Sequence, residues 1–262
     1  MARVSAIDYW ETLESELYPG NTTTSTCLQP AVMAVESSLE LGDRQRSNIV
    51  YRLDGGSGTD ENLAWLLDRG YQIVAKGFSG RRAHVLAQQV RRWDQTGSDA
   101  FVGSVASPMN FSRPTWVIVK KWQKAGKWRH SYYVTTLKLP SKQAFLRYYD
   151  LRGGAEVEQF REDKSGLFLS FRRKRSWNAQ NGLIHLTDLA HNLLADFRFR
   201  ALSASPFKSW GLKRTVRDLL AVPGRIYFEG SQVKRIELKH DHPCAQDLLI
   251  CLQRYQNQPF GK

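Results

Sequence analysis

The chain has few cysteines and no long apolar run. Its 262 residues include three cysteines, Cys27, Cys244 and Cys251. An odd number at wide spacing excludes a disulfide framework, and seven residues between the last two is not a usual zinc spacing. No stretch approaches the ~20 apolar residues of a membrane span, and no N-terminal segment resembles a signal peptide. We therefore expect a protein of the reducing cytoplasm, without a membrane partner.

Acidic residues are also scarce relative to basic ones. The 25 Asp and Glu residues face 38 Lys and Arg residues, which gives a formal net charge of +13 and a pI of about 9.8. Such an excess favours a polyanionic partner, either nucleic acid or an acidic membrane face. Eight tryptophans lie among the basic residues, and aromatic side chains interleaved with cations suit nucleic acid.

The first half of the chain alternates helix and strand signals. Residues 1–26 predict an irregular segment, because they are polar and include the loop "ELYPGNTTTST". Residues 27–93 read as helix, strand, helix, strand, helix, with "NIVYRLD" and "YQIVAKG" as the strands. This pattern predicts an α/β sheet with parallel strands covered by helices.

The second half is more varied. Residues 99–138 predict a β-rich segment with a tight hairpin turn at "QKAGK". Two helices are expected on either side of Gly153-Gly154, followed by an extended basic stretch, "LFLSFRRKRSW". A strong helix then covers "LIHLTDLAHNLLADFRFRAL". Residues 206–262 predict a helix, a hairpin and a last helix.

The stretch "YRLDGGSGTDENLAWLLDRGYQIVAKG" puts Asp54 at the end of a strand, before a glycine-rich turn and a helix capped by Thr59 or Asp60. Ligands gather at the carboxyl ends of parallel strands, and glycines let a phosphate backbone come close. Asp54 is thus a candidate metal ligand. The alternative is that its carboxylate only shapes the turn. Ser57 is excluded as a nucleophile because no His/Asp pair accompanies it.

Three motifs together resemble bacterial insertion-sequence transposases with an Asp-Asp-Glu triad. The Asp54 stretch resembles the region of their second catalytic aspartate. "YDLRGGAEVEQFREDKSGL" resembles their Tyr-Arg-Glu-Lys signature, with Tyr149, Arg152 and Glu156 at the family's spacing, and "LTDLAHNLLADFR" is similar to the helix that follows it. Lys164 lies eight residues after Glu156, where the family has seven. The resemblance covers residues 45–200.

The resemblance implies an α/β fold with an RNase H-like mixed sheet flanked by helices. A β-rich insertion would precede the helix of the catalytic Glu. The implied organisation is an N-terminal remnant (1–26), the core with the second Asp (27–98), the insertion (99–138), the Glu helix and core helices (139–205), and a C-terminal extension (206–262). The first aspartate has no match, since Asp8 lacks a flanking apolar strand. We therefore expect an N-terminally truncated form with an exposed strand edge and poor solubility.

The implied activity is DNA strand cleavage and transfer. Asp54 and Glu156 would be the catalytic ligands of Mg²⁺ or Mn²⁺, since carboxylates suit hard cations, and two such ions can drive attack on a phosphodiester. Tyr149 and Arg152 would hold a phosphate on the same helix face as Glu156. A surface ion pair between Arg152 and Glu156 remains the alternative. Glu158 has the wrong spacing from Arg152.

Further basic and aromatic residues are candidates for holding DNA. One set follows the signature, and the other surrounds the hairpin, where the tryptophans could stack on unpaired bases. A solvated basic face with core tryptophans is the open alternative. The candidates are Lys164, Arg172, Arg173, Lys174, Arg175, Lys121, Trp122 and Lys124. His191, beside Asn192 on an apolar helix, is expected to be buried and hydrogen-bonded rather than a metal ligand.

The expected partners are DNA, as element ends and target, and a second copy of the chain. An alternative function follows from the missing first aspartate: a regulatory remnant that binds DNA without cutting it. A nuclease of the same fold that does not transpose is a third possibility.

Overall fold

The computed structural model describes residues 1–6, 10–171 and 174–257, except for the side chains of residues 152–158. The chain divides into two compact units. Unit 1 comprises Met1–Val4 and Glu16–Gly154, and unit 2 comprises Ser5–Ser15 and Ala155–Lys262. Among the described residues, no helix is both long enough and apolar enough to cross a bilayer.

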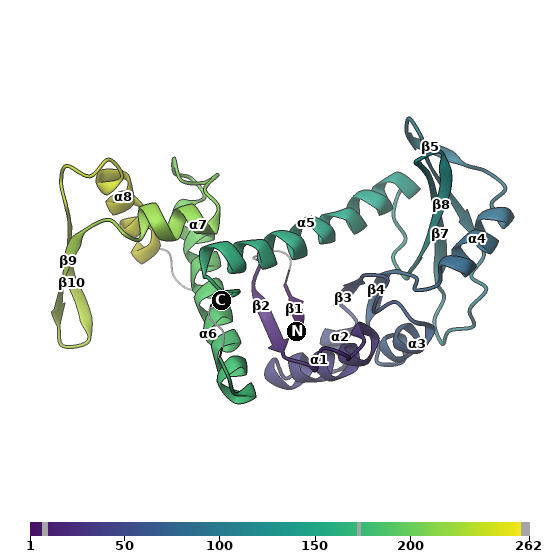
Figure 1. The fold of residues 1–262 in the computed structure, drawn as a ribbon, viewed down its shortest axis with the longest axis horizontal. Helices are drawn as coiled ribbons and strands as arrows, with labels where there is room; N and C mark the ends of the chain where they lie inside the picture. Colours follow the sequence, from purple (N-terminus) through teal and green to yellow (C-terminus); the bar gives the residue numbers. More distant parts are fainter. Residues whose placement is uncertain (7–9, 172–173, 258–262) are drawn as a thin grey trace. The chain divides into compact units, whose positions relative to one another are not determined.

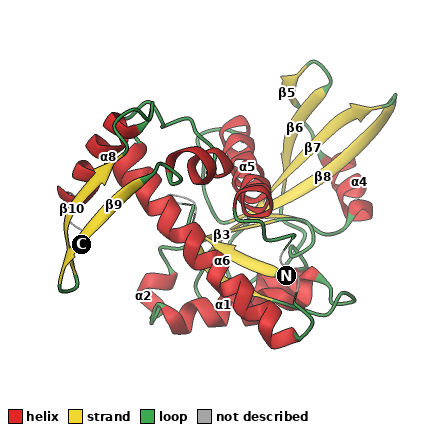
Figure 2. Cartoon of the chain, turned by 60° about the vertical axis from the view of Figure 1, so that its left-hand side comes forward, coloured by secondary structure: helices red, strands yellow, loops and turns green. Residues whose placement is uncertain are grey.

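Unit 1 is built on a mixed sheet of six strands in the order β3-β4-β8-β7-β6-β5 (Figures 1 and 2). Strands β3 and β4 are parallel, and every other neighbouring pair is antiparallel. The strands are β3 (Val50–Leu53), β4 (Gln72–Lys76), β5 (Asp94–Gly97), β6 (Ala100–Val105), β7 (Trp116–Lys124) and β8 (Lys127–Thr135).

Helices cover both faces of this sheet because its central strands alternate apolar residues between the two faces. The helices of unit 1 are α1 (Thr24–Ser38), α2 (Asp43–Arg46), α3 (Asp60–Asp68) and α4 (Gly80–Gln89). Ile73 and Ala75 pack in one core with residues of α1, α3 and α4. Val74, between them, packs in a second core with Phe145 and Tyr149 of α5 (Lys142–Gly166).

The turn between β7 and β8 is as tight as the sequence predicts. Ala125 and Gly126 have φ angles of 51° and 72°, the left-handed pair of a two-residue hairpin loop. The paired strands extend to the tip, where Lys124 lies opposite Lys127. The predicted β-rich segment therefore contains strands β6, β7 and β8.

Unit 2 contains the remaining helices and an antiparallel ribbon. They are α6 (Trp177–Phe197), the π-helical turn η1 (Arg198–Leu202), α7 (Leu212–Arg214), the π-helical turn η2 (Thr215–Leu219), β9 (Gly224–Glu229), β10 (Gln232–Leu238) and α8 (Ala245–Asn257). A core around Leu202, Leu219 and Leu248 packs these elements together. The helix, hairpin and last helix predicted for residues 206–262 are thus confirmed.

Three local predictions differ from the structure. Residues 1–26 are not wholly irregular, because β1 (Ala2–Ser5) pairs with β2 (Thr12–Glu16), and α1 begins at Thr24. Helix α5 runs unbroken through Gly153-Gly154, and turns rather than a strand occupy the described part of residues 167–176. The two glycines weaken α5 only slightly, by about 1 kcal/mol each, and the chain after Gly166 turns at the helix end, where the N–H groups of Leu167 and Leu169 both donate to the carbonyl of Asp163.

Candidate functional site

Asp54 directly follows β3, the strand that lies parallel to β4. Its Oδ1 accepts a hydrogen bond of 3.1 Å from the backbone N–H of Ser57, and its backbone carbonyl accepts the N–H of Gly58 at 3.0 Å. The carboxylate therefore does shape the turn, as the alternative reading expected. Among the described residues no partner is found for the second oxygen, Oδ2, which leaves the half-buried carboxylate able to bind a cation.

Two glycines let this turn pack against the end of β4. A Cβ on Gly58 would lie 1.9 Å from the carbonyl oxygen of Lys76, and one on Gly77 would lie 1.9 Å from the ring of Tyr132. The N–H of Phe78 also donates to the carbonyl of Gly58 at 3.1 Å. These close approaches hold the strand end in place, and no side chain other than hydrogen fits at either position.

Asn62 fixes the other side of the turn. Its Nδ2 donates to the carbonyls of Ser25, at 2.9 Å, and Ser57, at 3.2 Å. Thr59 caps α3 by accepting the N–H of Asn62 at 3.3 Å. The loop after Asp54 is thus tied to both α1 and α3, so its backbone is positioned before any ligand arrives.

The first half of α5 packs beside the strand that carries Asp54. Arg52 donates from Nη1 to the carbonyl of Tyr148 at 2.9 Å, and its guanidinium lies 4.7 Å from the centre of the Tyr148 ring. Tyr149, predicted to hold a phosphate, is 6% exposed, and its ring centre lies 4.7 Å from that of Tyr133. Its ring is therefore part of the core.

Arg152 and Glu156 lie on α5 by their backbone, and their side chains are outside the described residues. The same holds for Glu158. Further along the helix Lys164 is exposed. Of the basic stretch, Lys174 and Arg175 are exposed just before α6, and Arg172 and Arg173 lie outside the described residues.

The helix similar to the family's Ala-His-Asn-Leu segment anchors the N-terminal part of unit 2. His191 is 3% exposed, with Nδ1 2.7 Å from Asp163 Oδ1 and Nε2 2.8 Å from the carbonyl of Trp10. Gln159 also donates to that carbonyl, at 2.6 Å. His191 is thus buried and hydrogen-bonded, as the sequence predicted.

Asn192 completes the anchor by pairing with one residue of β2. Its Oδ1 accepts the N–H of Thr12, and its Nδ2 donates to the carbonyl of Thr12, both at 2.8 Å. Sequence reasoning missed Trp10, Gln159 and Asp163 as partners. The sequence did contain a signal for Gln159 and Asp163. Positions 149, 152, 156, 159 and 163 are three or four residues apart, so they lie on one face of α5 together with the signature residues.

The β7–β8 hairpin has two different faces near its tip. On one face the Lys121 ammonium lies over three rings, 4.3 Å from Trp93 and 5.2 Å from both Phe101 and Trp128. The other face carries Trp122, half-buried, among cations for which no ion pair is found in the described part of the chain. These cations are Lys120, Lys124, Lys127 and Arg129.

The described residues contain no obvious metal-binding cluster. No group of three or more His, Cys, Asp or Glu side chains there could hold a metal ion. All three cysteines are free thiols. Of the two predicted metal ligands, Asp54 and Glu156, only the side chain of Asp54 is among the described residues. Its carboxylate oxygens are hard donors of the kind that suit Mg²⁺.

A family model covers most of the chain. The model described as "Transposase DDE domain group 1" matches residues 9–259, which is nearly the whole chain. A search among curated proteins finds no match.

Proposed function

Because the chain belongs to the family of transposase DDE domains of group 1, we propose that it cleaves DNA at the ends of a bacterial insertion sequence and transfers them to a target. The family implies an enzyme that cleaves nucleic acid. The mixed sheet flanked by helices is compatible with an RNase H-like fold. The match over residues 9–259 is the observation that carries this proposal.

Asp54 and Glu156 are the proposed ligands of Mg²⁺ or Mn²⁺. Divalent ions would activate the attacking oxygen and stabilise the leaving oxygen of the phosphodiester. The oriented carboxylate of Asp54, with one oxygen hydrogen-bonded to Ser57, supports its part of this role. Its fixed turn removes the need to order a loop when the substrate binds.

Arg152 and Tyr149 are the proposed phosphate contacts beside Glu156. In this structure both the ring and the hydroxyl oxygen of Tyr149 are buried, so a phosphate could reach this residue only after the surrounding side chains move. Lys164 and the basic stretch Arg172–Arg175 would hold the DNA backbone. The basic face around Trp122 supports DNA contact by the hairpin as well. Its cations would neutralise backbone phosphates and so release the counterions bound to DNA, which favours association. The indole of Trp122 could stack on an unpaired base.

The proposal predicts metal-dependent nicking of a supercoiled plasmid that carries the element's ends. Asp54→Asn and Glu156→Gln should each lower the nicking rate at least 100-fold, because one ion ligand is lost. Asp68→Asn, at an exposed helix end, and Glu158→Gln are the matched controls and should retain activity. Nicking that survives both Asp54→Asn and Glu156→Gln would rule out these residues as the catalytic ligands.

The same measurement separates the proposal from its main alternative. DNA binding without nicking by the unchanged chain would favour a regulatory protein that lacks catalysis. Nicking without joining of the cut end to target DNA would favour a nuclease.

A homodimer is part of the proposed function, and α6 offers a surface for it. Leu186, Leu189 and Leu193 are 65%, 56% and 59% exposed and recur at spacings of three and four. Gly182, four residues before Leu186, meets open space.

We expect Leu189→Glu to shift the chain from dimer to monomer in sedimentation equilibrium. Leu220→Glu, at a 49% exposed leucine outside α6, is the control and should leave the dimer intact. A wild-type chain that stays monomeric at micromolar concentration would contradict this role of α6.

A further inference from the structure

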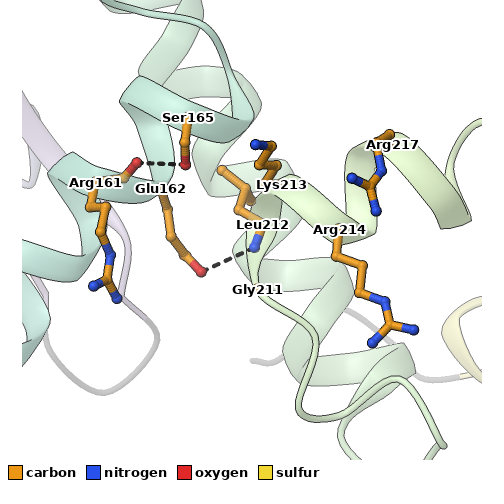
Figure 3. A pocket seen from close by; sticks show the side chains of 8 residues that line it. All are labelled: Arg161, Glu162, Ser165, Gly211, Leu212, Lys213, Arg214 and Arg217. Carbon is orange, nitrogen blue, oxygen red and sulfur yellow. Dashed lines mark hydrogen bonds between the residues drawn. The ribbon is translucent and has the colours of Figure 1, made fainter.

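A basic pocket in unit 2 joins the last part of the signature stretch to residues 211–217, which belong to no motif of the sequence. It has a volume of about 320 Å³ and is formed by the second half of α5 and the helical turns α7 and η2 (Figure 3). Its lining residues are Arg161, Glu162, Ser165, Gly211, Leu212, Lys213, Arg214 and Arg217. Four of these are cations, and none is aromatic.

The acidic residue in the lining does not neutralise the pocket. Glu162 Oε1 accepts the backbone N–H of Leu212 at 3.0 Å, and Oε2 accepts Arg198 Nη1 at 3.1 Å. Both oxygens are therefore occupied by an N–H at the start of α7 and by a cation that does not line the pocket. Figure 3 shows the bond from Glu162 to the backbone beneath Leu212.

The cations of α7 and η2 in the lining are neutralised to different degrees. Arg217 forms two bonds with Asp218, of 2.5 and 2.8 Å. Arg214 stacks 3.8 Å from the ring centre of Trp210, and its Nε lies 3.7 Å from the same aspartate. For Lys213, which is exposed, no ion pair is found in the described part of the chain. Lys213 thus adds a positive charge to the pocket that no ion pair among the described residues offsets.

We propose that this pocket binds a backbone phosphate of the DNA substrate. Guanidinium groups match phosphate oxygens with two parallel bonds, and a lysine adds a compact charge. The absence of aromatic rings from the lining leaves nothing on which a base could stack, so recognition is of the backbone and independent of sequence.

The position of Arg161 on α5 relates the pocket to the reacting phosphodiester, a step that rests on the proposed function. Arg161 lies five residues beyond Glu156 on the same helix. At a rise of about 1.5 Å per residue this is roughly 7.5 Å along the axis, about two base-pair steps of DNA at 3.4 Å. Five residues also turn the helix by about 500°, so Arg161 points about 140° away from Glu156 around the axis, and DNA in the pocket would lie on another side of α5 from the reacting phosphodiester.

The test is the salt dependence of DNA binding by an Arg161→Ala/Lys213→Ala variant. Fluorescence anisotropy would follow a duplex with the element's end sequence and a scrambled duplex, in EDTA and in the Asp54→Asn background. Loss of up to two phosphate contacts should lower the slope of log affinity against log salt by about 1 to 2. The two duplexes should weaken by the same factor.

The matched control is Arg225→Ala/Lys208→Ala, which removes the same charge from exposed positions of unit 2 outside the pocket. It should change the slope by less than half as much, and Lys213→Arg should keep wild-type binding. Thermal unfolding confirms that each variant is folded. A pocket variant with the wild-type slope and affinity would overturn the inference, whatever the nicking assay shows, because no metal or catalysis is involved.

Discussion

At the scale of single residues, Glu36 is the buried acid with the most partners in unit 1. It is 9% exposed, and its Oε1 accepts hydrogen bonds from Arg69 Nε at 3.0 Å and from the Tyr71 hydroxyl at 2.7 Å. Burial acts to raise the pKa of this carboxyl, but the hydrogen bonds and charges around it outweigh burial and hold the pKa below its ordinary value of 4.5.

This depressed pKa predicts a loss of stability in acid. The unfolded chain binds the proton more readily, so the contribution of Glu36 is present above about pH 4.5 and is lost as the pH falls through the folded value. Urea unfolding between pH 6 and pH 3 should show a smaller decline for Glu36→Gln than for the wild type. Glu40→Gln, at an exposed position, is the control, and equal declines in all three chains would contradict the prediction.

At the scale of elements, strand β2 depends on helix α6 for part of its hydrogen bonding. Asn192→Ala removes both bonds to the backbone of Thr12, a residue 6% exposed. Leaving a buried N–H and a buried carbonyl without partners should cost about 2 to 4 kcal/mol. Urea unfolding gives the cost, and hydrogen exchange at the Thr12 amide should speed up with it.

Asn178→Ala is the control for Asn192→Ala. Asn178→Ala removes the same side chain from an exposed position at the start of α6 and should change the free energy of unfolding by less than about 0.5 kcal/mol. Equal effects of the two substitutions would show that the contact with Thr12 contributes nothing.

The same elements show what the sequence could predict. Strands β3 and β4 were predicted because β-branched and aromatic residues cluster between clear turns, and Asp54 was placed at a strand end for the same reason. Strand β2 was missed, since its partner Asn192 lies 180 residues away. The continuity of α5 was missed because two glycines weaken a helix by about 1 kcal/mol each, and packing elsewhere on the helix offsets this.

The candidate site was also only partly predictable from the sequence. Local chemistry marked Asp54, the signature and the hairpin cations. It could not show that the ring of Tyr149 packs against Tyr133 or that Lys121 lies among three aromatic rings. Nor could it find the basic pocket, whose residues come from positions 161–165 and 211–217 and share no motif.

At the scale of the whole molecule, the two units differ in how they use the chain. Unit 1 is almost one continuous stretch, Glu16–Gly154, whereas unit 2 combines Ser5–Ser15 with the C-terminal part. The net charge of +13 predicts DNA binding whether the chain is a catalyst or a regulator that binds DNA without cutting it. Salt sensitivity of DNA binding therefore cannot distinguish them, and the nicking assay must.

The bond between Asn192 and Thr12 has a consequence for synthesis. A ribosome that adds about 5 to 20 residues per second needs roughly 10 to 40 seconds to travel the 180 residues between them. The segment Ser5–Ser15 therefore leaves the ribosome well before Asn192 is made. Residues Glu16–Gly154 of unit 1 are made within that interval and can fold during it, whereas β2 forms its hydrogen bonds to Asn192 only later.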